Sequence, residues 1–428
     1  MDAVQAQYEA FPYPARAPAD EARRLIEGSP SHPVEIDYFL FGGRRDWRKP
    51  FRALVAGGGT GDGLVMLAQK LADIRCPAEI TYLDLSTASR AVAEARIAAR
   101  GLTTVRFVTG DLMEAPALGS FDYIDCCGVL HHLPDPDAGF GALAEALAPD
   151  GGIGLMVYAP HGRTGVYPLQ DAFGALLAED DPSEKVALAR SVLETLPETN
   201  WLKRNPFLGD HRDGDAGLYD LLLHARDRAY EIGALEGALE RAGLGLAGVV
   251  EEARYDPRRY LPRTEAMAAR LARLSPGERR ALAERLAGNI KTHVVYAAPA
   301  ARAGRAQVSV PSLVAGLPPD HVPHLTVVAE KLARAVAREG AVTLTLDGLS
   351  HRLPLAPSRD EAQVLAAMLA AVDGRRSLGT VLDAGEAMMR RRDGPTARSG
   401  GRAQALWVGA EGALRGFNLL HYSRGARR

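Results

Sequence analysis

The chain has 428 residues, of which 47% are hydrophobic and 24% charged, with a formal net charge of −2. This composition excludes wholesale disorder, collagen-like and coiled-coil architectures, and the length predicts two domains. Three cysteines are too few for a disulfide framework, which indicates a reducing compartment. The opening residues resemble no secretory signal and no run of 18 apolar residues occurs, so we expect a soluble, cytoplasmic protein with no membrane span.

Residues 1–50 form an opening arm that precedes the regular part of the chain. It begins with the aromatic, proline-rich stretch YEAFPYP, and residues 20–28, DEARRLIEG, have a helical pattern. Tyr8 and Tyr13 of this stretch are candidates for a lid over a bound ligand. The alternative is a terminal arm that only packs on the domain.

From residue 50 the chain alternates apolar strands with amphipathic helices. We expect strands at 52–56, 79–84, 105–108, 121–130 and 153–157. We expect helices at 64–71, 86–100 and 138–147, with a turn at 149–152. This rhythm predicts βαβ units and a parallel sheet that is covered on both faces.

The rhythm is interrupted at 160–230 by an insert with helical patterns, such as SEKVALARSVLETL. It resumes with a helix (ALEGALERAGL), a strand at 247–250, two helices and a strand at 292–298. The last two strands suggest a hairpin-like end to the sheet. The fold class is therefore α/β, with a doubly wound, mostly parallel, Rossmann-like sheet over residues 1–300.

A linker is expected at 299–307, followed by a smaller α+β domain at 307–428. In this domain we expect a helix at 324–338 and a hairpin that turns at Asp347–Gly348. Helices at 359–373 and 377–391 and a flexible loop at 390–404 follow. The order of these elements is compatible with a winged-helix-like module but is not diagnostic of one.

A glycine-rich loop follows the first strand and precedes a helix. Gly57, Gly59 and Gly61 allow a sharp turn and a close approach of the backbone to a ligand. The dinucleotide fingerprint G-x-G-x-x-G fails, because its third glycine would fall on Asp62 or on Leu64. This failure argues against a nicotinamide-dependent oxidoreductase.

Five segments, taken in order, resemble the class I S-adenosylmethionine-dependent methyltransferases. They are ALVAGGGTGDG, ITYLDLS, VTGDLME, FDYIDCCGVLHHLPDP and LAPDGGIGLMVY. The resemblance is strong over residues 50–160 and rests on secondary-structure rhythm alone at 230–298. It implies an enzyme of this fold that uses S-adenosylmethionine to methylate an amine, a hydroxyl or a protein side chain. The alternative is a non-catalytic S-adenosylmethionine-binding regulatory protein.

The resemblance also implies roles for the residues at matching positions. The glycine loop would lie against the methionyl part of the cofactor, and Asp84 would bind both ribose hydroxyls. Asp111 would receive the adenine amino group, with a backbone contact from Leu112, and Gly128 would lie beside the sulfonium. The sequence departs from the family at Val55, where an acidic residue is usual and helps to hold the loop or the amino end of the cofactor.

Methyl transfer itself needs mainly alignment and exclusion of water, with a base where the acceptor must lose a proton. His131 follows the fourth strand and is the candidate base, with a structural turn as the alternative for it and for His132. Tyr158, His161 and Tyr167 are candidates to line the acceptor pocket, or else they pack or lie exposed. The helical pattern at 210–230, which contains His224, falls in the same insert and is a weaker acceptor candidate.

No CxxC motif or histidine cluster with metal-ligand spacing occurs, so we expect no metal, and Cys126 and Cys127 are expected in the core. Residues 301–428 carry 18 Lys+Arg against 11 Asp+Glu but no recognised nucleic-acid motif. Their layout is similar to that of bacterial methyltransferases with an additional regulatory region, some of which modify protein lysines. We expect this domain to dimerise or to dock an acceptor protein.

Overall fold

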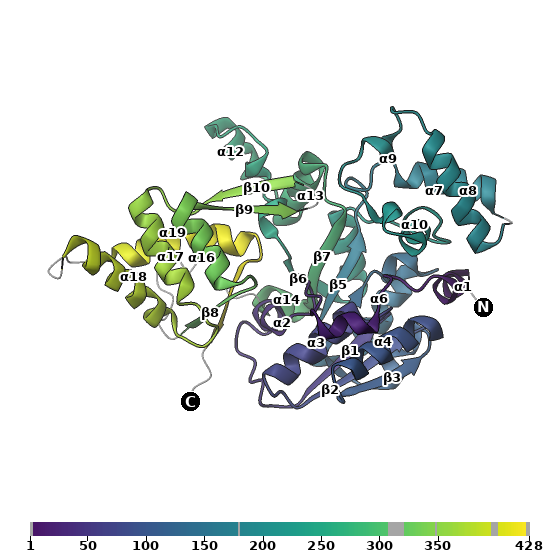
Figure 1. Ribbon diagram of the computed structural model, residues 1–428, viewed down its shortest axis with the longest axis horizontal. Coiled ribbons are helices and arrows are strands. Elements are labelled where there is room, and N and C mark those ends of the chain that lie inside the picture. The colour runs from purple at the N-terminus through teal and green to yellow at the C-terminus, as the bar shows by residue number, and fades with distance from the viewer. Residues whose placement is uncertain (1–2, 179, 307–320, 347–348, 395–400, 425–428) are drawn as a thin grey trace.

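The computed structural model describes residues 3–178, 180–306, 321–346, 349–394 and 401–424. Within these residues the central sheet has seven strands in the spatial order β3-β2-β1-β4-β5-β7-β6. The strands are β1 (Phe51–Ala56), β2 (Ala78–Asp84), β3 (Val105–Thr109), β4 (Phe121–Cys127), β5 (Leu147–Tyr158), β6 (Leu244–Val249) and β7 (Thr292–Pro299). Helices surround this sheet (Figure 1), as the predicted doubly wound α/β fold requires.

The first five strands pair in parallel, and only β7 runs antiparallel to its neighbours. β7 lies between β5 and β6, so the last two strands form the antiparallel end that the sequence predicts. The turn expected at 149–152 is wrong, because these residues belong to β5. They are accommodated by a register shift against β4 between Phe121 and Tyr123.

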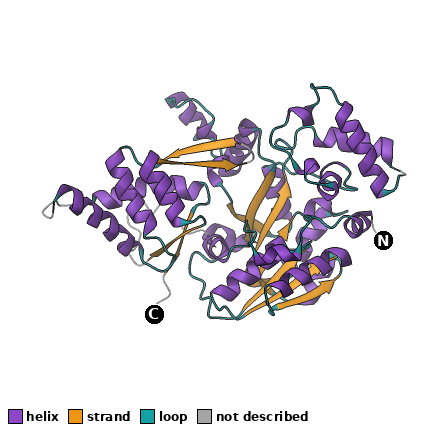
Figure 2. Cartoon of the chain, viewed as in Figure 1, coloured by secondary structure: helices purple, strands orange, loops and turns teal. Residues whose placement is uncertain are grey.

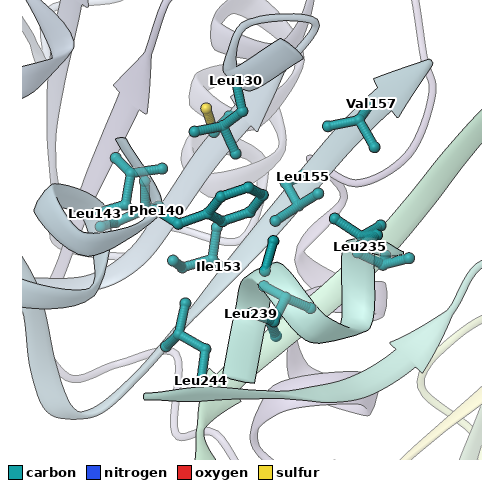
Figure 3. Close-up of a cluster of buried hydrophobic side chains, with 14 of the residues drawn as sticks. Leu130, Phe140, Leu143, Ile153, Leu155, Val157, Leu235, Leu239 and Leu244 are labelled. Carbon is teal, nitrogen blue, oxygen red and sulfur yellow. The ribbon is translucent and has the colours of Figure 1, made fainter. Parts of the chain in front are cut away.

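Each face of the sheet has its own apolar cluster, because successive strand residues point to opposite faces. Leu54 joins the cluster under α6 (Pro136–Glu145) and α11 (Ile232–Arg241), where the Phe140 ring lies beside Ile153 and Leu155 (Figure 3). Its neighbours Ala53 and Val55 join the cluster on the other face. That face is covered by α2 (Pro33–Leu40), α3 (Asp62–Asp73) and α4 (Thr87–Ala99).

The opening arm is less helical than its sequence pattern predicts. It contains α1 (Ala3–Ala10) and a short 3-10 helix, η1 (Pro18–Ala22), so most of the helix expected at 20–28 is wrong. The chain leaves helical geometry after η1, where the buried Glu21 carboxylate pairs with Arg96 at 2.7 Å and with Arg100 at 2.5 Å. These ion pairs fix the course of the arm more strongly than its local propensity.

Two of the connections between strands carry short helical segments. The one between β3 and β4 carries η2 (Leu112–Glu114) and α5 (Ala115–Leu118), and the one after β4 carries η3 (Leu130–His132). Helices joined by loops make up the described part of the insert after β5, which packs around its own apolar cluster. Its helices are α7 (Val166–Leu177), α8 (Pro182–Thr195), α9 (Trp201–Arg204), η4 (Asp210–Arg212) and α10 (Asp215–Leu222).

Between β6 and β7 the chain forms η5 (Glu252–Tyr255), η6 (Pro257–Arg259), α12 (Glu265–Leu271) and α13 (Pro276–Ala287). The linker expected at 299–307 is wrong over most of its length, because α14 (Ala300–Ala306) follows β7 directly. This helix packs on β6 and β7, with Ala303 buried and Arg302 donating to the carbonyl of Leu40 at 2.9 Å. Residues 307–320 lie outside the described residues.

The C-terminal residues form a second helical body beside the sheet (Figure 2). The predicted hairpin is present as β9 (Ala341–Leu346) and β10 (Leu349–Pro354), although its turn at 347–348 lies outside the described residues. The helices are α16 (Ala329–Glu339), α17 (Arg359–Ala370), α18 (Leu378–Asp393) and α19 (Arg402–Gly416).

Two expectations for this C-terminal unit are corrected. The helix expected from 324 begins at Ala329, because β8 (His321–Leu325) instead pairs with β11 (Leu420–Arg424). Both ends of the loop expected at 390–404 are helical, since α18 reaches Asp393 and α19 begins at Arg402. The buried Trp407 of α19 donates to the Tyr422 hydroxyl at 2.8 Å, which anchors the pair of strands that the sequence did not predict.

The C-terminal unit docks on the sheet through α2. Arg415 donates to the Tyr38 hydroxyl at 2.7 Å, and the Asn418 amide donates to Glu35 at 2.9 Å. The His421 ring packs edge-on against the Tyr38 ring. In the part of the chain that the structure describes, no helix has the length and apolar character needed to cross a bilayer.

Candidate active site

The glycine loop between β1 and α3 has a backbone that other residues rarely adopt. Gly57, Gly59 and Gly61 have φ angles of +71°, +49° and +96°. At Gly57 a Cβ atom would also lie 2.3 Å from a methyl group of Val129. The loop therefore requires glycine for its conformation and for its close packing.

Asp84 ends β2 and ties the loop to the sheet. One carboxylate oxygen accepts the Gly59 N–H at 2.7 Å, and the other accepts the Ser86 N–H at 2.8 Å. Burial raises the pKa of Asp84, although these backbone hydrogen bonds oppose the shift. The carboxylate thus stands beside the loop at the carboxyl edge of the parallel strands, where ligands of open α/β sheets bind.

One cavity of about 520 Å³ brings most of the predicted residues together. Its lining includes the three glycines of the loop, Asp84, Asp111, Leu112, Gly128, Tyr8, Tyr13 and Tyr158. His132 also lines this cavity, whereas His131, His161 and Tyr167 do not. The cavity therefore unites the predicted cofactor residues but not the predicted base.

The fold resembles that of PKMT2 from Rickettsia typhi, with a TM-score of 0.60 at 14% identity, over 92% of this chain and 75% of that one. The same protein in complex with AdoHcy gives a TM-score of 0.59. A family model described as a methyltransferase domain matches residues 54–153, which contain the glycine loop, Asp84 and Gly128. The chain belongs to the S-adenosylmethionine-dependent methyltransferases.

Two further relatives of this methyltransferase match in sequence. An uncharacterized protein of Synechococcus sp. is 33% identical over 302 residues, which is 69% of this chain and 70% of that protein. Polyketide synthase ThaQ of Burkholderia thailandensis is 28% identical over 163 residues, 36% of this chain and 8% of that synthase.

Asp111 and Gly128 of the methyltransferase follow β3 and β4 at the same edge of the sheet. One Asp111 oxygen accepts the Met113 N–H at 2.9 Å and so begins η2, while Glu114 accepts the Asp111 N–H. Gly128 has a φ of +74° and little around the position of a Cβ. The cap on η2 explains the aspartate at 111, and the positive φ explains the glycine at 128, whether or not these residues also bind a ligand.

The opening arm lies directly across the glycine loop. The Thr60 hydroxyl donates to the carbonyl of Pro14 at 2.7 Å. Arg16 forms a bidentate ion pair with Asp62, with distances of 2.6 to 3.1 Å. The Ser86 hydroxyl donates to the carbonyl of Tyr8 at 3.2 Å. The arm is thus fastened to the loop and to the turn after β2, which agrees with either a lid or a packed arm.

Two tyrosine hydroxyls converge on one buried carboxylate that sequence reasoning did not single out. Tyr8 donates to one oxygen of Asp220 at 3.1 Å, and Tyr158 donates to the other at 3.0 Å. Burial raises the pKa of Asp220. The three side chains come from the arm, the end of β5 and α10, and all three line the cavity. The only sequence signal was an acidic residue on an apolar helix within the insert.

Two histidines lie beside this carboxylate. The His132 and His224 rings stack with centroids 3.7 Å apart, and Tyr8 contacts His224 Nε2 at 3.1 Å. Ligand atoms of His132, Asp220 and His224 lie within 4.8 Å of one another, as a metal site requires. However, the lone pairs of two stacked rings lie in nearly parallel planes and are poorly placed to meet at one ion, and both Nδ1 atoms already contact the backbone of Arg226. This geometry favours a hydrogen-bonded network.

His131 stands behind the cavity wall. Its side chain is fully buried against Tyr158, with ring centroids 4.2 Å apart, and within the described residues neither ring nitrogen has a hydrogen-bond partner. Burial lowers the pKa of His131 well below its usual value. The structure therefore gives no support to His131 as the base, because it does not reach the space where an acceptor would lie.

Arg163 packs on the ring of Tyr158. Its guanidinium lies 3.7 Å from the centre of the Tyr158 ring and pairs with the buried Asp227 at 2.8 Å. It also donates to the Tyr167 hydroxyl at 3.1 Å. Tyr167 thus helps to hold the arginine, while His161 lies near Glu231 at 3.7 Å.

We expect Gly57→Ala to abolish binding of S-adenosylhomocysteine (AdoHcy), with Gly101→Ala as its matched control. Both glycines have a positive φ, +71° and +65°, so each substitution costs about 1–2 kcal/mol in backbone strain. The added Cβ atom clashes with Val129 only at Gly57, because nothing lies within 4 Å of a Cβ atom at Gly101. Calorimetric titration and thermal unfolding measure both effects. Equal AdoHcy affinities of the two variants would contradict the requirement for a close approach.

Proposed function

We propose that the methyltransferase holds S-adenosylmethionine along the carboxyl edge of its sheet. In this arrangement the glycine loop contacts the methionyl part, Asp84 binds the ribose, and Asp111 with Leu112 receives the adenine. Gly128 lies beside the sulfonium. The observation that carries the proposal is that these residues, from the ends of the four strands β1 to β4, line one continuous cavity.

Asp84 has the hydrogen-bonding capacity that a ribose needs. Each of its oxygens already accepts one backbone N–H, which leaves a further acceptor site on each oxygen. Two acceptors on one carboxylate match the two hydroxyls of a cis-diol. One oxygen of the Asp111 carboxylate, Oδ1, accepts the Met113 N–H at the start of η2. The other oxygen, Oδ2, is available to an amino group.

The opening arm serves in this proposal as a lid, with Tyr8 and Tyr13 over the bound cofactor. Both residues line the cavity. Residues 3–16 are attached by half-buried contacts as well as by the Arg16–Asp62 ion pair, whereas the buried Glu21–Arg96 pair holds the arm beyond them. A segment that is held by a few polar contacts opens at a lower cost than the core of the domain. Such a segment suits the entry and release of a ligand.

The acceptor site belongs on the insert side of the cavity, at Tyr158 and Asp220. S-adenosylmethionine supplies a methyl group that is already activated, so the protein must align the acceptor and take up any proton that it loses. Asp220 is a buried carboxylate with a raised pKa, which suits it to accept that proton. Tyr158, held by Arg163 and Asp220, would orient the acceptor, and His131 would only support Tyr158.

The acceptor is an amine or a hydroxyl, on a small molecule or on a protein side chain, because a carboxylate base serves both. We assign residues 307–428 an accessory role in docking a protein acceptor or in dimerisation, which light scattering of the full chain would test. The fold likeness to PKMT2 covers 92% of this chain and so includes part of this unit, which supports treating it as built into the enzyme. The free thiols of Cys76, Cys126 and Cys127 support a cytoplasmic setting.

The first test is calorimetric titration with S-adenosylmethionine, S-adenosylhomocysteine (AdoHcy) and NAD in parallel. We expect micromolar binding of the first two ligands and none of NAD, because the loop lacks the dinucleotide spacing. Binding of NAD alone would contradict the proposed site.

Asp220→Asn should slow methyl transfer by about 10²-fold or more while AdoHcy affinity stays within a few-fold of wild type. The amide keeps the shape of Asp220 but is no longer a proton acceptor of useful strength. Asp213→Asn, an exposed change in the same insert, is the matched control. The measurement is AdoHcy release with a panel of amines, alcohols and lysine peptides. Full activity of Asp220→Asn on an acceptor that the wild type methylates would remove Asp220 from proton transfer.

Arg16→Gln should raise the dissociation rate of AdoHcy several-fold, because it breaks the ion pair that fastens the arm to the start of α3. Arg23→Gln is the control, since Arg23 lies in the same arm with 83% of its side chain exposed. Stopped-flow displacement measures the rate. An unchanged rate would favour a packed arm over a lid.

A further inference from the structure

Asp125 is a buried acid in the wall of the cofactor cavity that the roles above leave unused. It lies in β4, where it is the Cα partner of Val55 in the neighbouring strand β1. Only 2% of Asp125 is exposed, and both residues line the cavity. The acidic residue that is missing from the first strand at Val55 is thus present one strand away, at the same height in the sheet.

The side chain of Asp125 has hydrogen-bond donors but no cation. The Ser31 hydroxyl donates to its Oδ2 atom, and the Cys127 thiol contributes a second hydrogen bond. Among the described residues no Lys, Arg or His forms an ion pair with it. Burial raises the pKa of Asp125 to about 6, because the hydrogen bonds from Ser31 and Cys127 only partly offset the cost of holding its negative charge away from water. A buried carboxylate in this state gains most from a ligand that brings a positive charge.

The Asp125 carboxylate lies next to α3, the helix that follows the glycine loop. A Cβ atom on Gly63, in the first turn of α3, would lie 3.4 Å from Asp125 Oδ2 and 2.8 Å from Ser31 Oγ. Asp125 therefore faces the part of the cavity beside the loop, where the methionyl end of the cofactor is placed by the proposed function.

Three other acids of the cavity already have side-chain partners of their own. Asp62, the acid nearest to the loop in sequence, pairs with Arg16 and Arg96. Burial raises its pKa, but the hydrogen bonds from these two arginines more than offset this and lower it. Glu27 pairs with Lys70, and Asp220 receives two tyrosine hydroxyls. Asp62 is thus occupied in holding the arm, and Asp84 and Asp111 are assigned to the ribose and the adenine in the proposed function. Asp125 is the acid that remains for a cation at the methionyl end.

We propose that Asp125 binds the α-ammonium group of the methionyl moiety of S-adenosylmethionine, in place of the acid that the first strand lacks. This inference rests on the proposed placement of the cofactor. Ser31 would hold the carboxylate in position, because its segment is fixed by the Tyr123 and Tyr296 hydroxyls, which donate to the carbonyl of Pro30 at 2.8 and 2.6 Å. An ammonium group donates charge-assisted hydrogen bonds to such a carboxylate, which are stronger than neutral ones.

The test compares two ligands on two proteins. AdoHcy carries the α-amino group, and an analogue with hydrogen in its place does not. Wild type should bind AdoHcy about 10- to 100-fold more tightly than the analogue, and Asp125→Asn should remove most of this difference by losing affinity for AdoHcy alone. Asp122→Asn, in the same strand but outside the cavity lining, should keep the full difference.

A double variant, Val55→Asp with Asp125→Val, moves the carboxylate back to the first strand. Because the two positions are paired and both line the cavity, it should recover most of the preference for AdoHcy. An equal loss of both ligands in Asp125→Asn, or an unchanged preference, would overturn the inference. Failure of the wild type to bind either ligand would contradict the proposed cofactor site itself, so the two failures are distinguishable.

Discussion

The buried guanidinium of Arg96 sets the geometry on which the cofactor cavity depends. Only 1% of its side chain is exposed, and it binds the Glu21 carboxylate, the Asp62 carboxylate and the carbonyl of Thr60 at 2.7 to 2.8 Å. A charge buried to this extent is tolerated only when its partners are in place. One side chain of α4 therefore fixes three separate segments: the arm, the tip of the glycine loop and the start of α3.

The cavity that results has two chemically different sides. On the loop side lie the glycine loop and the acids at the ends of strands, to which we assign the parts of the cofactor that do not react. On the insert side, Tyr8, Tyr158 and Asp220 form a network in which each hydrogen bond depends on a different element. Substitutions on the first side should change affinity, whereas those on the second should change the rate with a given acceptor.

The parts of the site that could be predicted from the sequence are those that depend on local chain geometry. The strand, glycine loop and helix at 51–73 and the acid at Asp84 are neighbours in one βαβ unit, so their pattern is visible in order. Asp220 was missed because its role arises from Tyr8, 212 residues earlier, and from the placement of Tyr158. The strands β8 and β11 were not predicted for the same reason, because each is too short to be recognised without the distant strand with which it pairs.

The docking of Asn418 on Ser29 and Glu35 has a consequence for the order in which the protein matures. These contacts join residues up to 389 positions apart, and they brace the segment that carries Ser31. During synthesis the glycine loop and its strand leave the ribosome long before Asn418 exists. The pocket wall is therefore completed only after Asn418 has emerged, so a nascent chain carries a partly built site until that point.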